Sequence, residues 1–156
     1  MSRVEILFEE RERNQKKIQA YLEQYEAEFT PALSSHVAID QYAEKISANA
    51  CVFWVEYAEK CIGMCAVYMN RGMSAYITSI NIDLNYSGRG FGTILMEHVK
   101  EEARRKHMER IELEVSRENR NAIQYYKANG FGVCREKKEW YVMAYRFKKD
   151  NDKPHH

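Results

Sequence analysis

The spacing of apolar residues changes several times along this chain of 156 residues, and each change predicts a new element. Strict alternation at the start, in Val4, Ile6 and Phe8, is the pattern of a strand with one buried face. Apolar residues three and four positions apart then predict two amphipathic helices, one over Arg11–Glu28 and one ending near Ala50. Alternating or continuous apolar segments predict further strands over Cys51–Glu56, Cys61–Met69, Ala75–Ile82, Arg110–Ser116, Phe131–Glu136 and Trp140–Phe147.

Two more helices are expected between these strands, and residues near their ends indicate where they begin and stop. One helix reaches about His107. The other begins with a capping box at Asn121–Gln124 and ends at Gly130, because glycine readily adopts the left-handed conformation of a C′ residue. The strand, helix and strand over Asn81–Val115 make the two strands parallel neighbours, because such crossovers keep one handedness.

The stretch Asn81–Val99 joins the end of a strand, a glycine-rich loop and the start of a helix. A single alternating apolar run leads to the loop and is formed by Tyr76, Ile80, Ile82 and Leu84. Gly88, Gly90 and Gly92 follow, and glycine tolerates φ > 0 and has no Cβ to hold a phosphate away. Backbone N–H groups and the positive end of a helix dipole converge on an anion in this arrangement. The spacing matches neither the dinucleotide fingerprint nor the Walker loop, so it indicates another nucleotide-like cofactor, with a plain tight turn as the alternative.

Composition and charge narrow the classes of protein to which the chain can belong. A hydrophobic content of 45% fits a single domain, which we expect over residues 1–148, followed by a polar tail over residues 149–156. The net charge of +1 gives no reason to expect a nucleic acid or a membrane as partner. No apolar run has the length of a membrane span or the character of a secretory signal, so we expect a cytoplasmic protein. The cysteines and histidines form no cluster with zinc spacing, and no metal is expected.

A second motif follows the glycine loop at Leu113–Phe131. This segment resembles the block Leu-Glu-Val…Asn-x-x-Ala-Ile-x-x-Tyr…Gly-Phe of the GCN5-related N-acetyltransferases, the GNAT family. The positions in step are Asn119, Ala122, Ile123, Tyr126, Gly130 and Phe131. The loop Gly88–Thr93 resembles the pyrophosphate loop of the same family, Arg/Gln-x-x-Gly-x-Gly/Ala, although Ser87 stands where that pattern has Arg or Gln. The resemblance covers about Val52–Phe147, and the residues before it match only in outline.

The resemblance implies an α/β fold of the α+β type, with a mixed, mostly antiparallel central sheet, a splayed pair of parallel strands and helices on both faces. It also implies acetyl-CoA as co-substrate, bound in the gap between the splayed strands. The backbone at Ile82 and Leu84 would bind the pantetheine as an added strand does, and Asn119 would reach the pantetheine or the phosphates. The pyrophosphate would bind Ser87, Gly88, Arg89, Gly90, Phe91, Gly92 and Thr93.

The same resemblance implies direct transfer of the acetyl group to an amine, with two residues that move protons. Glu114 is the candidate base that takes the proton of the amine through a water. Tyr126, which would also contact the cofactor, is the candidate acid for the departing thiolate, with packing in the core as the alternative. The N–H of Leu84 or Ile82 would polarise the thioester carbonyl. A solvated or cap-binding carboxylate is the alternative for Glu114, and Asp83 is the second candidate base.

The identity of the acceptor is left open by these motifs. The acceptor is a primary amine on a small molecule or a peptide, and the first two helices would form one wall of its site, as in the resembling family. Candidate contacts on that wall, with core packing as the alternative for the aromatic rings, are Tyr21, Tyr25, Phe29 and His36. Two other functions fit the motifs, an acyltransferase that uses a longer acyl-CoA and a non-catalytic acyl-CoA-binding module. The sequence is compatible with a monomer and with a homodimer.

Overall fold

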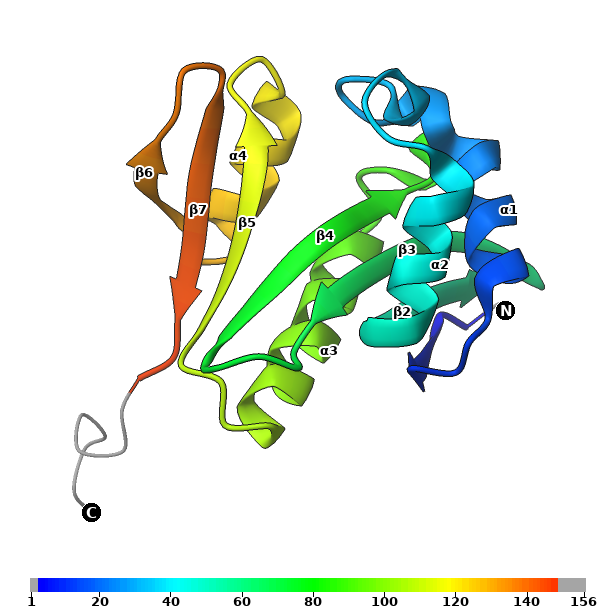
Figure 1. Cartoon of the computed structure of the whole chain (residues 1–156), viewed down its shortest axis with the longest axis horizontal. Helices are drawn as coiled ribbons and strands as arrows, with labels where there is room; N and C mark the ends of the chain where they lie inside the picture. The colour runs from blue at the N-terminus through cyan, green and yellow to red at the C-terminus, as the bar shows by residue number, and fades with distance from the viewer. Residues whose placement is uncertain (1–2, 149–156) are drawn as a thin grey trace.

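The strands of this protein form one sheet in the order β1-β2-β3-β4-β5-β7-β6, as Figure 1 shows. The structure is a computed structural model that describes residues 3–148, and the expected polar tail over 149–156 lies outside the described residues. All neighbouring strands are antiparallel except β4 and β5, which are parallel. The strands are β1 (Glu5–Glu10), β2 (Cys51–Tyr57), β3 (Lys60–Tyr68), β4 (Ser74–Ile82), β5 (Arg110–Ser116), β6 (Gly132–Glu136) and β7 (Trp140–Arg146).

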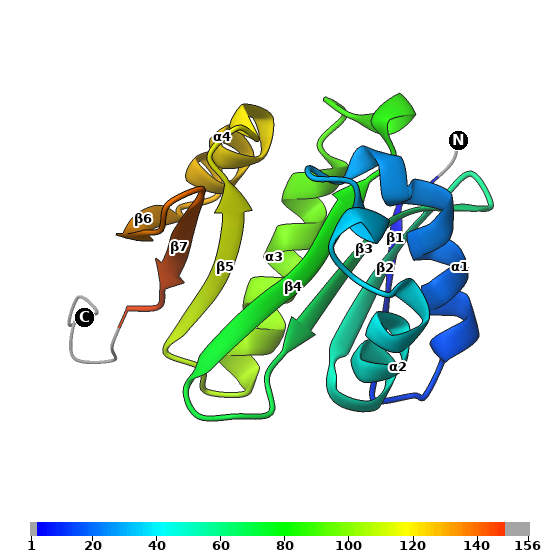
Figure 2. The same ribbon diagram turned by 45° about the horizontal axis from the view of Figure 1, so that its top comes forward.

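Helices cover both faces of the sheet, and each face has its own hydrophobic core (Figure 2). On one face, Leu22 of α1 and Ile46 of α2 are buried with Trp54 of β2. On the other face, Leu95 of α3 and Tyr126 of α4 belong to a second core. The α-helices are α1 (Gln15–Tyr25), α2 (Ile39–Asn49), α3 (Phe91–Arg105) and α4 (Arg120–Ala128).

This architecture confirms the expected α+β fold with a mixed, mostly antiparallel sheet. The crossover through α3 also makes β4 and β5 parallel, as the handedness argument required. Within residues 3–148, none of the helices combines the length and the apolar character that crossing a membrane would need.

The parallel strands β4 and β5 pair over a short segment and then diverge. The paired residues are Ser74 with Arg110, Ala75 with Ile111 and Tyr76 with Glu112. β4 continues as far as Ile82 and β5 as far as Ser116, so the carboxyl-terminal halves of the two strands do not pair with each other. Figure 1 shows the two strands opening from each other toward these ends, and the expected splayed pair is therefore confirmed.

A β-bulge at Thr78 changes the faces on which β4 presents its side chains. The register between β3 and β4 shifts by one residue between Ala66 and Val67, and this leaves Thr78 without a partner in the ladder. Beyond the bulge, Ile80 packs against the core beneath α3, whereas Tyr76, before the bulge, lies on the side of α2. The expectation of a single alternating run is therefore wrong, because the extra residue Thr78 places the side chains of Tyr76 and Ile80 on opposite faces of the sheet.

Two helix boundaries also differ from those expected. α1 covers Gln15–Tyr25 and is followed by a 3₁₀ turn over residues 26–28, so it is shorter than the expected span Arg11–Glu28. α4 is capped by Asn119 and not by Asn121, because the Asn119 Oδ1 atom accepts a hydrogen bond of 3.2 Å from an N–H group of the first turn. Two asparagines so close in sequence offer the same capping chemistry, and only the path of the chain from β5 selects between them.

Candidate functional site

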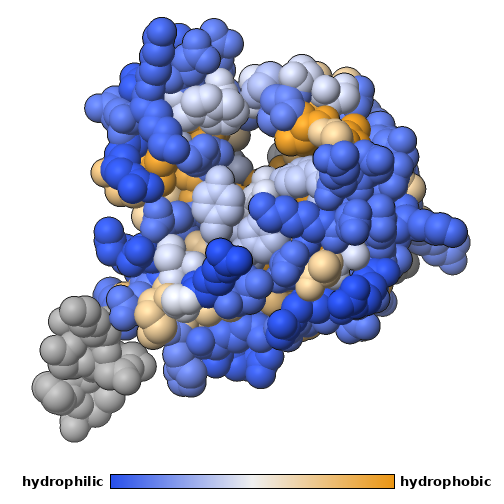
Figure 3. All heavy atoms as spheres, in the orientation of Figure 1, coloured by the Kyte–Doolittle hydropathy of each residue, from blue (hydrophilic) through white to orange (hydrophobic). Residues whose placement is uncertain are grey.

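A cavity of about 500 Å³ opens where β4 and β5 diverge. Figure 3 shows this hollow between the half of the molecule that carries β5 and α4 and the half that carries α1 and α2. Its walls are formed by β4 from Tyr76 to Asn81, by β5 from Leu113 to Ser116, by α4 and its cap, and by the connection between α1 and α2. The cavity brings together three of the predicted site residues, Glu114, Asn119 and Tyr126.

Tyr126 lies at the inner wall of the cavity. Its side chain is buried, with an exposed fraction of 7%, and its ring packs against Phe131 and Tyr125 at centroid distances of 5.8 and 5.3 Å. The hydroxyl group has no hydrogen-bond partner among the side chains and backbone groups of residues 3–148. Burial raises the pKa of the Tyr126 phenol, so the phenol keeps its proton at neutral pH.

Glu114 projects from β5 into the same cavity. Its neighbours Leu113 and Val115 are buried in the core beneath the sheet, which leaves Glu114 on the opposite face of the strand. The carboxylate forms an ion pair with Lys137 from the turn between β6 and β7. Its side chain is 35% exposed. Glu114 is thus a half-exposed carboxylate, held in place by a single cation and facing the cavity.

The glycine loop leads from the end of β4 to the start of α3. Gly88 and Gly90 adopt left-handed φ values of 73° and 86°, and a Cβ atom added at either position would meet nothing within 4 Å. Gly90 is the N-cap of α3, and its carbonyl accepts a hydrogen bond from the Ile94 N–H. The N–H groups of Phe91, Gly92 and Thr93 precede the first intrahelical bond and point out of the helix start. An open backbone surface and a helix N-terminus are the features that a pyrophosphate requires.

A sequence model of the Acetyltransferase (GNAT) family matches residues 17–131. The chain belongs to the GNAT family. The chain is 38% identical over 72 residues to an uncharacterized N-acetyltransferase of Methanocaldococcus jannaschii. That match covers 46% of the chain and 32% of the relative, so the chain spans about a third of the length of this curated relative.

Solved GNAT-type structures share the fold over nearly the whole chain. The paia N-acetyltransferase of Thermoplasma acidophilum, in complex with coenzyme A, is 13% identical with a TM-score of 0.72, and the match covers 93% of this chain and 99% of that one. The ribosomal-protein-S18-alanine N-acetyltransferase of Escherichia coli is 19% identical with a TM-score of 0.72, covering 97% and 98%. At these identities the likeness shows the fold.

Gly88 and Gly90 of this loop have positive φ values, whereas Gly92 is required because a neighbouring side chain leaves no room for a Cβ atom. A Cβ atom there would lie 2.9 Å from the Cε1 atom of Tyr125, and the Tyr125 hydroxyl donates a hydrogen bond of 2.6 Å to the Gly92 carbonyl. The third glycine of the loop therefore permits α4 to pack against the start of α3. It also ties the helix that carries Tyr126 to the candidate phosphate site.

Three other side chains of the loop are engaged with the protein, whereas that of Thr93 is exposed. The Arg89 guanidinium lies 5.0 Å from the ring centroid of Tyr57 and donates a hydrogen bond of 2.9 Å to its hydroxyl. The Ser87 hydroxyl donates to the Leu84 carbonyl at 3.0 Å and closes the turn before the glycines. Phe91 is buried beside Tyr57, so only the backbone of this residue is offered to a ligand.

The expectation that Leu84 continues the strand is wrong. β4 ends at Ile82, and Leu84 begins a 3₁₀ turn with its side chain largely exposed. The Leu84 N–H donates a hydrogen bond of 3.2 Å to the Glu28 Oε1 atom, so it is already occupied. Of the two backbone positions that the sequence suggested for the pantetheine, Ile82 lies in the strand and Leu84 does not.

Glu28 is a cavity residue that the sequence did not single out. Its Oε1 atom accepts hydrogen bonds from the Leu84 N–H and, at 3.1 Å, from the Asn81 amide group. Glu28 thereby connects the turn after α1 to the end of β4, and it lines the cavity. No local sequence motif predicts this role of Glu28, because its hydrogen-bond partners lie more than fifty residues away in the chain.

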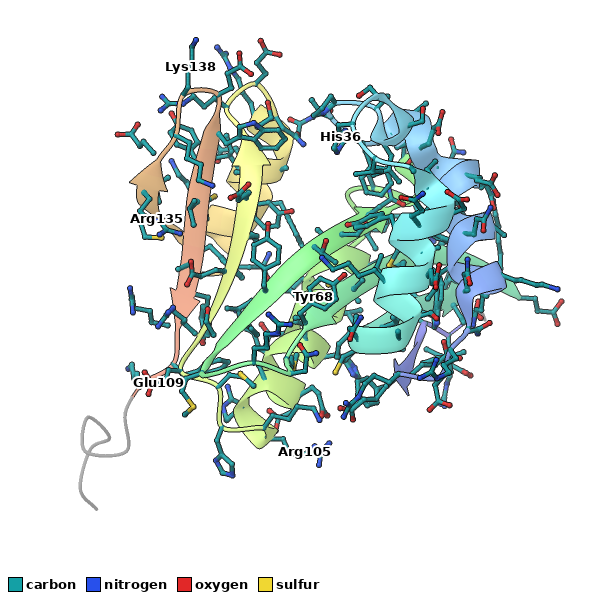
Figure 4. The ribbon with its side chains drawn as sticks, viewed as in Figure 1. His36, Tyr68, Arg105, Glu109, Arg135 and Lys138 are labelled. Carbon is teal, nitrogen blue, oxygen red and sulfur yellow. The ribbon has the colours of Figure 1, made fainter. Side chains whose placement is uncertain are left out.

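Two of the four candidate acceptor contacts line the cavity, and two have other partners. Phe29 and His36 lie on its wall, and Figure 4 shows His36 on the connection between α1 and α2. The hydroxyl group of Tyr21 instead donates to the Asn81 side chain, and that of Tyr25 donates to Asp83. The rings of Tyr21 and Tyr25 are buried in the core beneath α1 and α2, as expected from the alternative that these rings pack in the core.

Asp83, the second candidate base, is buried outside the cavity, with an exposed fraction of 3%. Burial by itself would raise the pKa of this carboxyl. The Tyr25 hydroxyl at 2.8 Å, the Asn85 N–H at 2.8 Å and the Lys60 ammonium at 3.5 Å outweigh that effect and hold the pKa below its usual range. A carboxylate that is stabilised in this way is a weak base, so its role is structural.

Within residues 3–148, the acidic, histidine and cysteine side chains form no group that could hold a metal ion.

We predict that the contribution of Asp83 to stability is lost in acid. Because its folded-state pKa lies below the unfolded value of about 3.9, the stabilisation is complete above that value and disappears as the pH falls through the folded-state pKa. Asp83→Asn should lower the free energy of unfolding by about 1–3 kcal/mol at pH 7 and by much less at pH 2, measured by urea denaturation. Glu139→Gln, at an exposed turn, is the control, and a difference for Asp83→Asn that does not change with pH would contradict the assignment.

Proposed function

We propose that this protein is an acetyl-CoA-dependent N-acetyltransferase that transfers an acetyl group to a primary amine by direct attack. The observation that carries the proposal is the cavity between the splayed ends of β4 and β5, which has a carboxylate, Glu114, and a protonated phenol, Tyr126, on its walls. The bond between Tyr125 and Gly92 ties the helix that carries Tyr126 to the glycine loop. Membership of the GNAT family supports the same reaction.

The residues of the chain fit acetyl-CoA, which would supply the activated acetyl group as a thioester. The N–H groups of Gly88–Thr93 would bind the pyrophosphate, since the open surface at Gly88 and Gly90 leaves room for it. The edge of β4 beyond its last pair with β5 would hydrogen-bond the pantetheine, with Ile82 at its end. Asn119 uses its Oδ1 atom as the helix cap, which leaves its Nδ2 atom to donate to the cofactor.

Glu114 is the residue that we assign to remove a proton from the acceptor amine. An amine must be neutral to attack, and a carboxylate that faces the cavity can accept its proton directly or through a water. Lys137 would hold the carboxylate without blocking the cavity, because its own side chain is half-exposed and does not line the cavity. Asp83 is set aside as a base, since its hydrogen bonds stabilise the ionised form.

Tyr126 is the residue that we assign to the leaving group. Its hydroxyl proton is retained at neutral pH and is not committed to a partner among the described residues. A phenol in that state can donate a hydrogen bond, and then its proton, to a thiolate as it forms. The backbone N–H groups of β4 near Ile82 would bind the carbonyl oxygen while negative charge develops on it.

The acceptor is a primary amine on a small molecule or a peptide, and the wall formed by Glu28, Phe29 and His36 would contact it. We place the protein in the cytoplasm as a monomer or a homodimer, without a nucleic acid or a membrane as partner, in keeping with its balanced charge. A longer acyl chain on the donor, or acyl-CoA binding without catalysis, are the alternatives. Release of free thiol from acetyl-CoA, propionyl-CoA and octanoyl-CoA with peptide amines and polyamines would distinguish the three functions.

We predict that Gly90→Val abolishes the binding of CoA. Valine at a φ of 86° strains the loop and places methyl groups over the backbone N–H groups that would face the pyrophosphate. Isothermal titration calorimetry should show an affinity for CoA reduced more than tenfold. Gly72→Val is the matched control, because Gly72 also has a positive φ, of 58°, and open surroundings but lies in another turn. Equal CoA affinities of the two variants would rule out the loop as the phosphate site.

We predict that Glu114→Gln loses turnover in a pH-dependent way. At pH 7 kcat should fall by about 10²–10⁴, and part of the loss should be recovered at pH 9–10, where the amine deprotonates without help. Lys137→Met is the control for the ion pair, because it removes the cation and keeps the carboxylate. If the pH–rate profile of Glu114→Gln is parallel to that of the unaltered protein, Glu114 is not the base.

We predict that Tyr126→Phe lowers kcat by about 10²–10⁴ and leaves the affinity for CoA nearly unchanged, because the ring and its packing are kept. Tyr125→Phe is not a clean control, since the Tyr125 hydroxyl binds the loop at Gly92. Tyr145→Phe serves instead, because Tyr145 packs against the same Phe131 ring from outside the cavity. Turnover of Tyr126→Phe at the rate of the Tyr145→Phe control would exclude the assigned role.

A further inference from the structure

A second pocket, of about 300 Å³, lies on the same face of the sheet as the main cavity. It is lined by side chains of α2, β3, β4 and the turn between these strands: Lys45, Asn49, Tyr68, Asn70, Arg71, Ser74 and Tyr76. Tyr76 lines both spaces, so the two adjoin along β4, and together they are called the groove here. The groove runs from Asn81 at the splayed end of the strand to Ser74 at its beginning.

The two ends of this groove carry opposite charge. The main cavity holds the carboxylates of Glu28 and Glu114, of which Glu114 is paired with Lys137, and the second pocket holds the cations Lys45 and Arg71. Glu28 accepts hydrogen bonds only from amide groups among the described residues, so no cation there offsets its charge. Neither Lys45 nor Arg71 forms an ion pair within residues 3–148.

Glu112, a carboxylate that adjoins the second pocket through Ser74, has partners of its own. Glu112 stands opposite Tyr76 on β5, where its Oε2 atom accepts hydrogen bonds from Arg110 at 2.6 Å and from Ser74 at 3.0 Å. Its Oε1 atom lies 3.6 Å from Arg135. These partners, Arg110 first, hold the pKa of the Glu112 carboxyl below its usual range although burial opposes them. With Glu112 compensated by two arginines, the pocket keeps the positive charge of Lys45 and Arg71.

Tyr68, which lines the second pocket, has an unused hydrogen-bonding group. The Tyr68 hydroxyl is buried and has no hydrogen-bond partner within the described residues. The Lys45 ammonium lies 5.5 Å from the centroid of the Tyr68 ring, and Figure 4 shows Tyr68 on the face of the sheet beside α2. A buried hydroxyl without a partner costs free energy, and a shift of the Tyr68 ring toward a ligand oxygen in the pocket would recover it.

We propose that the acceptor is a peptide whose amino terminus enters the main cavity and whose negatively charged group binds Lys45 and Arg71. The inference rests on the proposed acetyltransferase function and names the class of its acceptor. From Ser74 to Ile80, β4 advances six residues, but one of them is the bulged Thr78, so the strand covers about five extended steps, or about 17 Å at 3.3 Å per residue. An extended peptide needs about five residues to cover that distance, so the carboxylate lies about four or five residues after the amine. A single amino acid or an amino sugar is too short to occupy both ends.

Binding of matched peptides tests this proposal without requiring turnover. The probes are Ala-Ser-Ala-Ser-Ala with a free carboxyl terminus and the same peptide as its terminal amide, titrated by calorimetry into the protein saturated with CoA. The acid should bind at least tenfold more tightly than the amide, and the dipeptides Ala-Ser acid and Ala-Ser amide should not differ. Equal affinity of the two pentapeptides, or binding of neither, would overturn the proposal.

The double variant Lys45→Ala/Arg71→Ala identifies the site of recognition. It should remove the preference for the acid and leave the affinity for the amide unchanged, whereas Lys16→Ala, on the exposed side of α1, should keep the preference. A preference that survives the double variant would place the anion elsewhere. CoA affinity, measured in the same instrument, and thiol release report separately on the proposed function, so a failure of acetyl transfer with intact acid preference is distinguishable from a failure of this proposal.

Discussion

The short pairing between β4 and β5 is the constraint on which the site depends. Beyond Tyr76 the backbone of β4 pairs with β3 on one side and borders the cavity on the other. Buried N–H and C=O groups need hydrogen-bond partners, so an unpaired strand edge inside a domain is a binding surface for an extended ligand. The side chains of the candidate chemistry, Glu114 and Tyr126, are placed around this edge by the next strand and the helix after it.

A few tyrosine and glutamate contacts hold the open edge in place. From the α1 and α2 side, the hydroxyl groups of three tyrosines bind residues of β4 or the turn after it, and Glu28 binds the same turn. From the α4 side, Tyr125 binds the glycine loop. These contacts join segments that are far apart in sequence, and they fix the positions of cavity walls that the sheet alone would leave unsupported. Surrounding contacts of this kind are what give a site its defined geometry.

The carboxylates around the site differ in role because their surroundings differ. Asp83 is buried with three donors and stabilises the turn after β4. Glu28 accepts from amide groups and closes the wall of the cavity, and Glu112 is bound by arginines. Glu114 has one cation as partner and a free approach from the cavity. Proton transfer needs an accessible carboxylate, and this comparison favours Glu114 over the other three.

The sequence by itself determined the order of helices and strands, the parallel crossover and the glycine loop, because hydrophobic periodicity and glycine conformation are local properties. It also indicated the GNAT family, through a loop and a downstream block that keep their spacing. Only the tertiary structure decided that a bulge at Thr78 exchanges the faces of β4, that Leu84 leaves the strand, and that Gly92 makes room for Tyr125. Glu28 and the pocket at Lys45 also came from the structure, since their partners are brought together by packing between elements that are distant in the chain.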